Sequence, residues 1–113
     1  MSSGENFRKE REQLNEIVMK YAGKTTRRFF NLDTNVYKAG ALPEKTKEML
    51  GLVASLVLRC DDCIKYHLNQ CLEVNVTDEE MDEVMSIGLI VGGSITIPHI
   101  RRAMQFWDEN KKN

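Results

Sequence analysis

The residues best suited to chemistry are two cysteines and a histidine in one short segment. Residues 59–67 read RCDDCIKYH, so Cys60, Cys63 and His67 form a C-x-x-C-x-x-x-H motif. On an α-helix these positions share one face, and Cys63 and His67 are neighbours four residues apart. Cysteines three residues apart are close enough for a disulfide to form and break. An attacking thiolate, a base and a resolving thiol are the groups that dithiol redox chemistry requires.

The charges around this motif act in opposite directions. We expect a helix to begin near Cys60, where free N–H groups and the helix dipole stabilise a thiolate. Asp61 and Asp62 suit a helix N-terminus, but their negative charges oppose ionisation of a neighbouring thiol. Arg59 and Lys65 can offset them, and the sequence alone does not rank these effects.

A glutamate is the fourth candidate site residue. Glu48 lies twelve residues before Cys60, at the border of the apolar run MLGLVASLVL at residues 49–58. A carboxylate in that place could be partly buried and serve as a proton relay. Periodicity alone favours the ordinary alternative, a glutamate that lies in water.

Composition and cysteine content narrow the class of protein. The 113 residues suggest a single domain spanning residues 1–113. Sixteen basic and seventeen acidic residues give a net charge of −1, which provides no large basic field for nucleic acid. The polar start argues against a signal peptide, and no apolar run approaches the roughly 18 residues of a membrane span. We therefore expect a cytoplasmic protein whose three cysteines serve redox or metal chemistry.

Hydrophobic periodicity predicts an all-α fold of about six helices. We expect helices over residues 7–21, 25–38, 43–59, 60–73 and 77–92, and a last one that begins near residues 94–96. Thr77 and Glu80 form a capping box, and Pro98 lies in the first turn of the last helix. The run at residues 49–58 is apolar on nearly every face, which predicts a helix buried all round. In a domain this small, a subunit interface is the expected second cover.

The spacing of Glu48, eleven intervening residues and the C-x-x-C-x-x-x-H motif resembles the AhpD-like branch of the carboxymuconolactone decarboxylase family. The flanking segments at residues 31–33, 36–42 and 45–48 resemble it too, and the likeness covers roughly residues 29–107. It implies an all-α domain around a central buried helix pair, assembled into homotrimers or hexamers. Two departures are the shorter chain and Cys71, which replaces a residue that is often small.

The resemblance implies a thiol-dependent peroxidase or disulfide reductase, an alkylhydroperoxidase-like antioxidant. Such proteins reduce peroxides or regenerate a peroxiredoxin partner, with electrons from a dithiol donor. By resemblance, Cys63 is the nucleophile, deprotonated through His67, and Cys60 is the resolving thiol. Glu48 completes the proton relay through water. No cofactor is implied, and the members that decarboxylate a muconolactone lack this cysteine pair, so that reaction is not expected.

Two alternatives stay open on the residues themselves. A non-enzymatic oligomeric module, either a redox sensor or a partner-binding subunit, would keep the reversible disulfide without turnover. A zinc site could use Cys60, Cys63, His67 and Cys71, which share a face. However, four ligands along one helix that rises about 1.5 Å per residue cannot converge tetrahedrally.

Two further residues have ordinary interpretations. We expect Cys71 to be a small buried hydrophobic residue rather than a third redox thiol. His99, at the start of the last helix, is expected to be a surface or capping residue.

Overall fold

The computed structural model describes residues 2–111, and its elements are all helical. They are α1 (Ser3–Tyr21), α2 (Lys24–Val36), α3 (Glu44–Val57), α4 (Asp61–Glu73), α5 (Asp78–Gly92), the 3-10 helix η1 (Ser94–Thr96) and α6 (Ile97–Asn110). No strand occurs within these residues, so the predicted all-α class is confirmed. Over the same range, no helix has both the length and the apolar character needed to cross a membrane.

The helix ends follow local capping chemistry. α1 begins four residues before its predicted start, because the Ser2 side chain accepts a hydrogen bond from the Glu5 N–H. At α5, Thr77 and Glu80 bond each other's backbone N–H groups, which confirms the predicted capping box. α2 ends at Val36, two residues earlier than expected.

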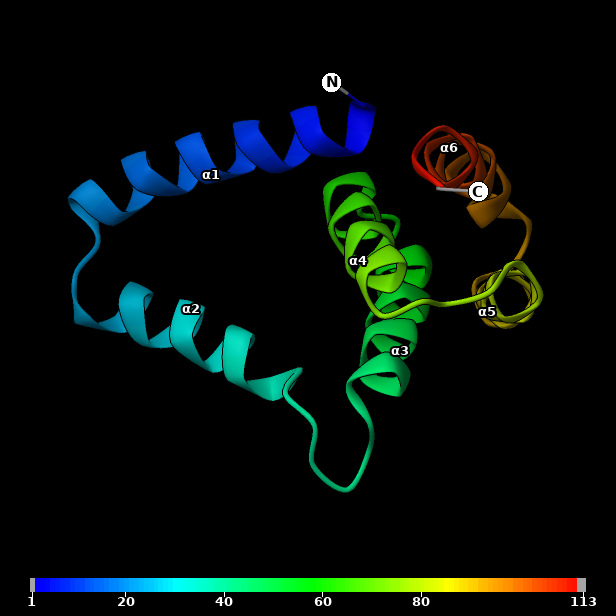
Figure 1. Ribbon diagram of the computed structural model, residues 1–113, viewed down its shortest axis with the longest axis horizontal. Coiled ribbons are helices and arrows are strands. Elements are labelled where there is room, and N and C mark those ends of the chain that lie inside the picture. The colour runs from blue at the N-terminus through cyan, green and yellow to red at the C-terminus, as the bar shows by residue number, and fades with distance from the viewer. Residues whose placement is uncertain (1, 112–113) are drawn as a thin grey trace.

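The core lies among α3, α4, α5 and α6, which gather on one side of the molecule (Figure 1). Leu52 and Leu56 of α3 and Leu68 of α4 belong to this core, and all three side chains are fully buried. The complete buried cluster is Leu52, Leu56, Ile64, Leu68, Cys71, Val76, Met81, Val84, Met85, Ala103, Phe106 and Trp107. Burial of these side chains is the main force that holds the four helices together.

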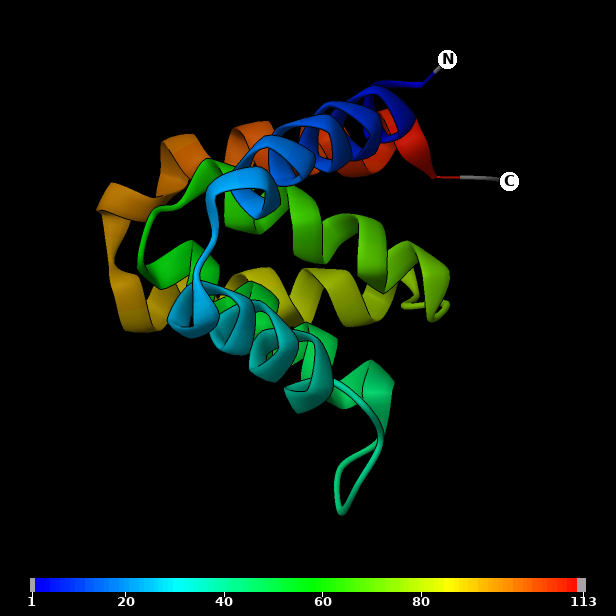
Figure 2. The same ribbon diagram turned by 90° about the vertical axis from the view of Figure 1, so that its left-hand side faces the viewer.

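Only the first half of α1 is attached to this core. The Gly4 N–H donates to Asn110 Oδ1 at 2.7 Å, and Asn69 Nδ2 donates to the Gly4 carbonyl at 3.1 Å. A Cβ at Gly4 would lie 2.7 Å from Asn69 Oδ1, so this close approach requires glycine. One turn later, Phe7 packs edge-on against Phe106. Figure 2 shows the resulting arrangement, with α1 beside α6 and both termini at one end.

The second half of α1 and all of α2, residues 12–36, extend away from the core as an arm (Figure 1). α2 contains no buried residue. The large apolar side chains of the arm that are exposed are Leu14, Ile17, Val18, Tyr21, Phe29, Leu32 and Val36. Their helical spacing agrees with the predicted helices, but within the described residues these side chains stay 40–79% exposed.

Within one chain, α3 is buried on one side only, since Leu50 and the C-cap residue Leu58 are 54% and 76% exposed. Burial of this helix on every face therefore stays a prediction that depends on the expected subunit interface. Glu48, Leu52, Ser55 and Leu56 form its buried side.

We predict that Leu56→Ala will lower the free energy of unfolding by about 2–5 kcal/mol, because it leaves a cavity against Gly88 of α5. Urea titration followed by far-ultraviolet circular dichroism measures the change. The matched control is Leu42→Ala, which removes the same atoms from an exposed position outside the core and should change stability by less than about 0.5 kcal/mol. Equal losses in the two variants would contradict this core assignment.

Candidate active site

The turn between α3 and α4 fixes the first cysteine. α3 ends in a Schellman motif, in which the Arg59 N–H donates to the Leu56 carbonyl and the Cys60 N–H donates to the Ser55 carbonyl. Arg59 has a φ of 58°, a left-handed conformation that is uncommon outside glycine. The backbone of Cys60 is therefore tied to the end of α3 at the point where α4 begins.

Cys60 and Cys63 lie together at the start of α4. Cys60 is the N-cap residue, and its Sγ accepts the Cys63 N–H at 3.2 Å. A disulfide joins the two residues, whose Cα atoms are 5.2 Å apart. Cys60 thus precedes the helix, whereas the sequence analysis placed it on the same helical face as His67. Both sulfurs lie where free N–H groups and the helix dipole favour negative charge.

One turn after Cys63, His67 is buried and bonded to a carboxylate from the preceding helix. Its Nδ1 lies 2.8 Å from Oε1 of Glu48, which is 1% exposed. The alternative of a solvated Glu48 is therefore wrong. A carboxylate can only accept a hydrogen bond, so Nδ1 carries the hydrogen and Nε2 is left as the acceptor of the ring.

Tyr37, which the sequence analysis did not select, faces this Nε2. The Tyr37 hydroxyl lies 3.4 Å from His67 Nε2, and the ring centroids are 5.1 Å apart. Burial, together with the negative charges of Asp33 and Glu48, raises the pKa of Tyr37. The hydroxyl therefore keeps its proton and donates to Nε2. The one sequence signal for this residue is its place in the family-like segment at residues 36–42.

Two residues of α3 hold the Tyr37–His67 contact in place. Lys47 Nζ donates to the carbonyls of Val36 and Lys38, at 2.8 and 2.7 Å, and so binds the chain on both sides of Tyr37. A Cβ at Gly51 would lie 2.7 Å from His67 Cε1 and 2.9 Å from the Tyr37 hydroxyl. The absence of a side chain at position 51 is what lets the two rings approach each other.

A cavity of about 470 Å³ opens beside the cysteine pair. Its lining residues are Phe7, Glu10, Arg11, Leu14, Asn15, Asp33, Asp62, Cys63, Lys65, Tyr66 and His67. The Arg11 guanidinium lies over the Tyr66 ring at 4.2 Å, so this wall combines an aromatic face with a cation. Such a mixed lining suits a small molecule with both apolar and polar parts.

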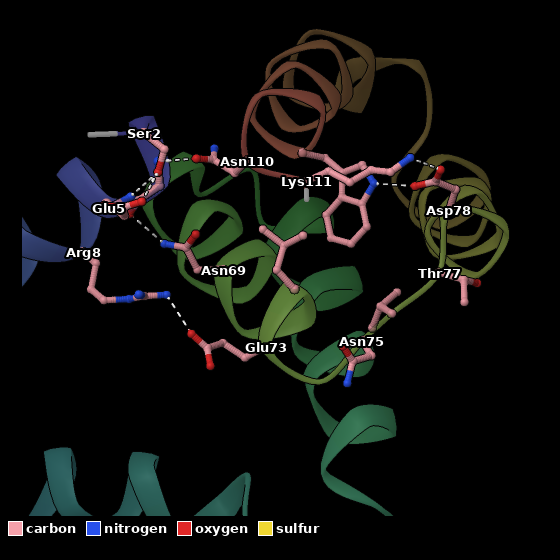
Figure 3. A pocket seen from close by; sticks show the side chains of 14 residues that line it. Ser2, Glu5, Arg8, Asn69, Glu73, Asn75, Thr77, Asp78, Asn110 and Lys111 are labelled. Atoms are coloured by element: carbon pink, nitrogen blue, oxygen red, sulfur yellow. Dashed lines mark hydrogen bonds and ion pairs between the residues drawn. The ribbon is translucent and has the colours of Figure 1, made fainter. Parts of the chain in front are cut away.

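A slightly larger cavity, of about 520 Å³, lies where α1, α5 and the ends of α4 and α6 meet (Figure 3). Its charged side chains largely pair with each other: Arg8 with Glu73, and Lys111 with Asp78. None of the four candidate residues from the sequence lines it. The cavity beside Cys63 is therefore the better candidate for a reaction site.

The remaining candidates from the sequence have different surroundings. Cys71 is fully buried. Burial raises the pKa of its thiol to about 12, and the negative charge of Glu48 makes a smaller contribution in the same direction. Within residues 2–111, no three His, Cys, Asp or Glu side chains gather in a way that could hold a metal ion. His99, which was expected to be a surface or capping residue, is partly buried near the start of α6, and its Nδ1 lies 2.8 Å from Asp61 Oδ1 at the start of α4.

Fold and site together define an all-α protein with a cysteine pair on a helix start and a buried Glu–His pair behind it. Residues 23–106 match the sequence profile of the carboxymuconolactone decarboxylase family. The chain belongs to this family, as the resemblance in its sequence predicted.

Solved structures of the family have the same fold. A Thermotoga maritima protein is 55% identical, with a TM-score of 0.90 over 92% of this chain and 91% of that one. A second crystal structure, with a TM-score of 0.88, describes that protein as a family member with the antioxidative response as a candidate role. A Legionella pneumophila family protein is 23% identical, with a TM-score of 0.86 over 96% of this chain and 97% of that one, and shows the shared fold alone.

Two curated relatives are uncharacterised proteins. One, from Cupriavidus necator, is 30% identical over 69 residues, which is 61% of this chain and 61% of the relative. The other, from the cox locus of Paracoccus denitrificans, is 25% identical over 81 residues, or 72% of this chain and 73% of the relative.

We predict that the reduced native protein will expose two reactive thiols to Ellman's reagent, and that the third will react only after unfolding. The reason is that Cys71 is buried and has a pKa of about 12, so almost no thiolate is present near neutral pH. Thiol counts with and without guanidinium chloride measure this. Cys71→Ala should give two thiols in both conditions, and rapid reaction of three thiols in the native wild type would contradict the assignment.

Proposed function

We propose that this protein is a thiol-dependent peroxidase or disulfide reductase, an alkylhydroperoxidase-like antioxidant enzyme. One observation carries the proposal: the buried Glu48–His67 hydrogen bond lies one turn behind a cysteine pair that borders a cavity. Family membership and the antioxidative role considered for the Thermotoga maritima relative support it. A cytoplasmic location suits the chemistry, because the oxidised pair must be returned to thiols.

In the first step Cys63 is the nucleophile, since it lines the cavity together with His67. Nε2 of His67 gives up its long, 3.4 Å contact with the Tyr37 hydroxyl and takes the Cys63 proton. The Glu48 carboxylate on Nδ1 stabilises the resulting imidazolium. The thiolate sulfur attacks the outer oxygen of a hydroperoxide, and the O–O bond breaks. Cys63 becomes a sulfenic acid, and the departing alkoxide takes the proton from His67 and leaves as an alcohol.

In the second step Cys60 resolves the sulfenic acid. Its sulfur attacks the Cys63 sulfur, the S–O bond breaks, and water leaves as the disulfide forms. The Cα atoms of the bonded pair are 5.2 Å apart, which lies within the usual range for a disulfide.

The disulfide is then reset by an external dithiol. Thiol–disulfide exchange through a mixed disulfide returns Cys60 and Cys63 to thiols and leaves the donor oxidised. The same reduced pair could instead pass its electrons to a disulfide substrate, such as an oxidised peroxiredoxin partner.

We predict that Cys63→Ser will abolish steady-state reduction of cumene hydroperoxide with dithiothreitol as the donor. His67→Ala and Glu48→Gln should lower the rate by about 10²–10⁴-fold, which is the usual contribution of proton transfer by a positioned side chain. Cys71→Ser is the matched control and should keep the rate of the wild type. Full turnover by Cys63→Ser would refute the proposal. A wild type that consumed one equivalent of peroxide and stopped would instead identify a redox sensor.

We also propose that the chain works as a homo-oligomer, a trimer or hexamer. The arm, residues 12–36, presents large apolar side chains that are 40–79% exposed within the part of the chain that the structure describes. Further exposed apolar residues lie directly after α3, in the second half of α5 and in η1, namely Leu58, Ile87, Leu89, Ile90, Val91 and Ile95. Apolar surface on this scale marks an interface in a soluble chain.

We predict that Leu32→Glu will shift the mass measured by light scattering after size-exclusion chromatography from an oligomer towards a monomer. Leu32 is 62% exposed on α2, and a charge there would be buried without a partner in an interface. Thr26→Glu introduces the same charge at a polar position of α2 and should leave the mass unchanged. A wild type that is monomeric at every concentration tested would exclude the oligomer.

A further inference from the structure

Asp61, the residue directly after Cys60, is bound by two side chains of α6. Its Oδ1 lies 2.8 Å from His99 Nδ1. Arg102 Nε donates to Oδ2 at 3.2 Å, and Nη2 lies 3.1 Å from the same oxygen. The first helical residue of α4 is thus held from outside its own helix, at the position next to the cysteine pair.

The protonation of this cluster follows from the chemistry of its atoms. His99 Nδ1 carries a hydrogen in order to donate to the carboxylate, so the contact of Arg102 Nη2 with that nitrogen, at 3.2 Å, is not a hydrogen bond. Both α6 side chains therefore donate to Asp61. Burial raises the pKa of Asp61, but the hydrogen bonds from His99 and Arg102 outweigh it and lower the pKa below its usual value. Asp61 is ionised near neutral pH and paired with a fixed positive charge.

This pairing affects how easily the cysteines ionise. The start of α4 favours a thiolate, whereas the negative charges of Asp61 and Asp62 oppose it. An unpaired carboxylate one residue from Cys60 and two from Cys63 would oppose formation of a thiolate. With the Arg102 guanidinium on the same carboxylate, the two charges nearly cancel as seen from the sulfurs. Asp62 differs from Asp61 in its surroundings, because it lines the cavity beside Cys63.

Other charged groups around the cysteine pair come from every neighbouring helix. They are Glu10 and Arg11 of α1, Asp33 of α2, Glu48 of α3, Arg59 of the turn, and Asp62, Lys65 and His67 of α4. The test described below changes only Asp61 and Arg102. The listed groups therefore contribute equally to the thiol pKa in every variant.

We propose that Arg102 is a positioning residue that neutralises Asp61 and thereby sets the thiolate fraction of the Cys60–Cys63 pair, with His99 holding the second carboxylate oxygen. This rests on the proposed function only in that the pair must exist as reduced thiols during its work.

The test is the ultraviolet absorbance of thiolate against pH, measured on the reduced full chain with Cys71→Ala as the background. Arg102→Ala leaves Asp61 with the hydrogen bond from His99 but without the compensating charge of the guanidinium. It should raise the titration midpoint by roughly half a pH unit, the size expected of one nearby exposed charge. Asp61→Asn leaves Arg102 unpaired and should lower the midpoint by about as much. The double variant, which lacks both charges, should return to the value of the background protein.

Further measurements distinguish an effect of the Arg102 charge from an effect of a lost structural contact. Arg102→Lys keeps the positive charge and should recover most of the shift, and added salt should shrink the shift of Arg102→Ala. Arg102 and Asp61 are partly exposed, at 51% and 42% of their side chains, so the variants should fold. Loss of a merely structural contact would move both single variants in the same direction. That result, or an unmoved midpoint in Arg102→Ala, overturns the inference.

The inference and the proposed function fail separately. Absence of peroxide turnover in the wild type would refute the proposed function. Midpoints of Arg102→Ala and Asp61→Asn that shift in opposite directions would still support the role of Arg102. Normal turnover in a protein whose midpoint ignores Arg102 would overturn the inference alone.

Discussion

The buried hydrogen bond between Glu48 and His67 is the constraint on which the site depends. A carboxylate that is 1% exposed is strongly unfavourable without a partner, so its bond to His67 sets how α3 and α4 lie against each other. His67 follows Cys63 by one turn of α4, and the bond to Glu48 fixes the orientation of its imidazole. The same bond directs Nε2 away from Glu48, towards the hydroxyl of Tyr37.

The cysteine pair is held from the other side by the short turn before α4. The Schellman motif commits the Cys60 N–H to α3, and the Cys60 sulfur caps α4. His99 and Arg102 of α6 also bind Asp61, so they fix the first residue of α4 from outside that helix. The site is therefore built where α2, α3, α4 and α6 each contribute a group, although its motif is a single stretch of sequence.

The sequence was sufficient for those features that depend on neighbours along the chain. Helical periodicity, the Thr77 capping box and the spacing of Cys60 and Cys63 all predicted local structure correctly. Burial of Glu48 could not be predicted from periodicity, because it depends on a partner on another helix, and only the family spacing pointed to it.

Longer-range contacts set the limit of the sequence analysis. Tyr37 and Arg102 were missed because their partners, His67 and Asp61, are 30 and 41 residues away, and nothing in the local pattern links such positions. For α1 and α2, periodicity showed which residues form an apolar stripe. It did not show that the stripe faces away from the core of its own chain.

The two hydrogen bonds of Lys47 have a mechanical consequence. They clamp the carbonyls on both sides of Tyr37 to α3, so the arm and the body are hinged at the residue that contacts His67. Tyr37 directly follows the exposed arm, and its hydroxyl contacts Nε2 of His67. The apolar segment of residues 12–36 is therefore continuous with the residue that faces the imidazole, so the surroundings of the arm are also the surroundings of the site.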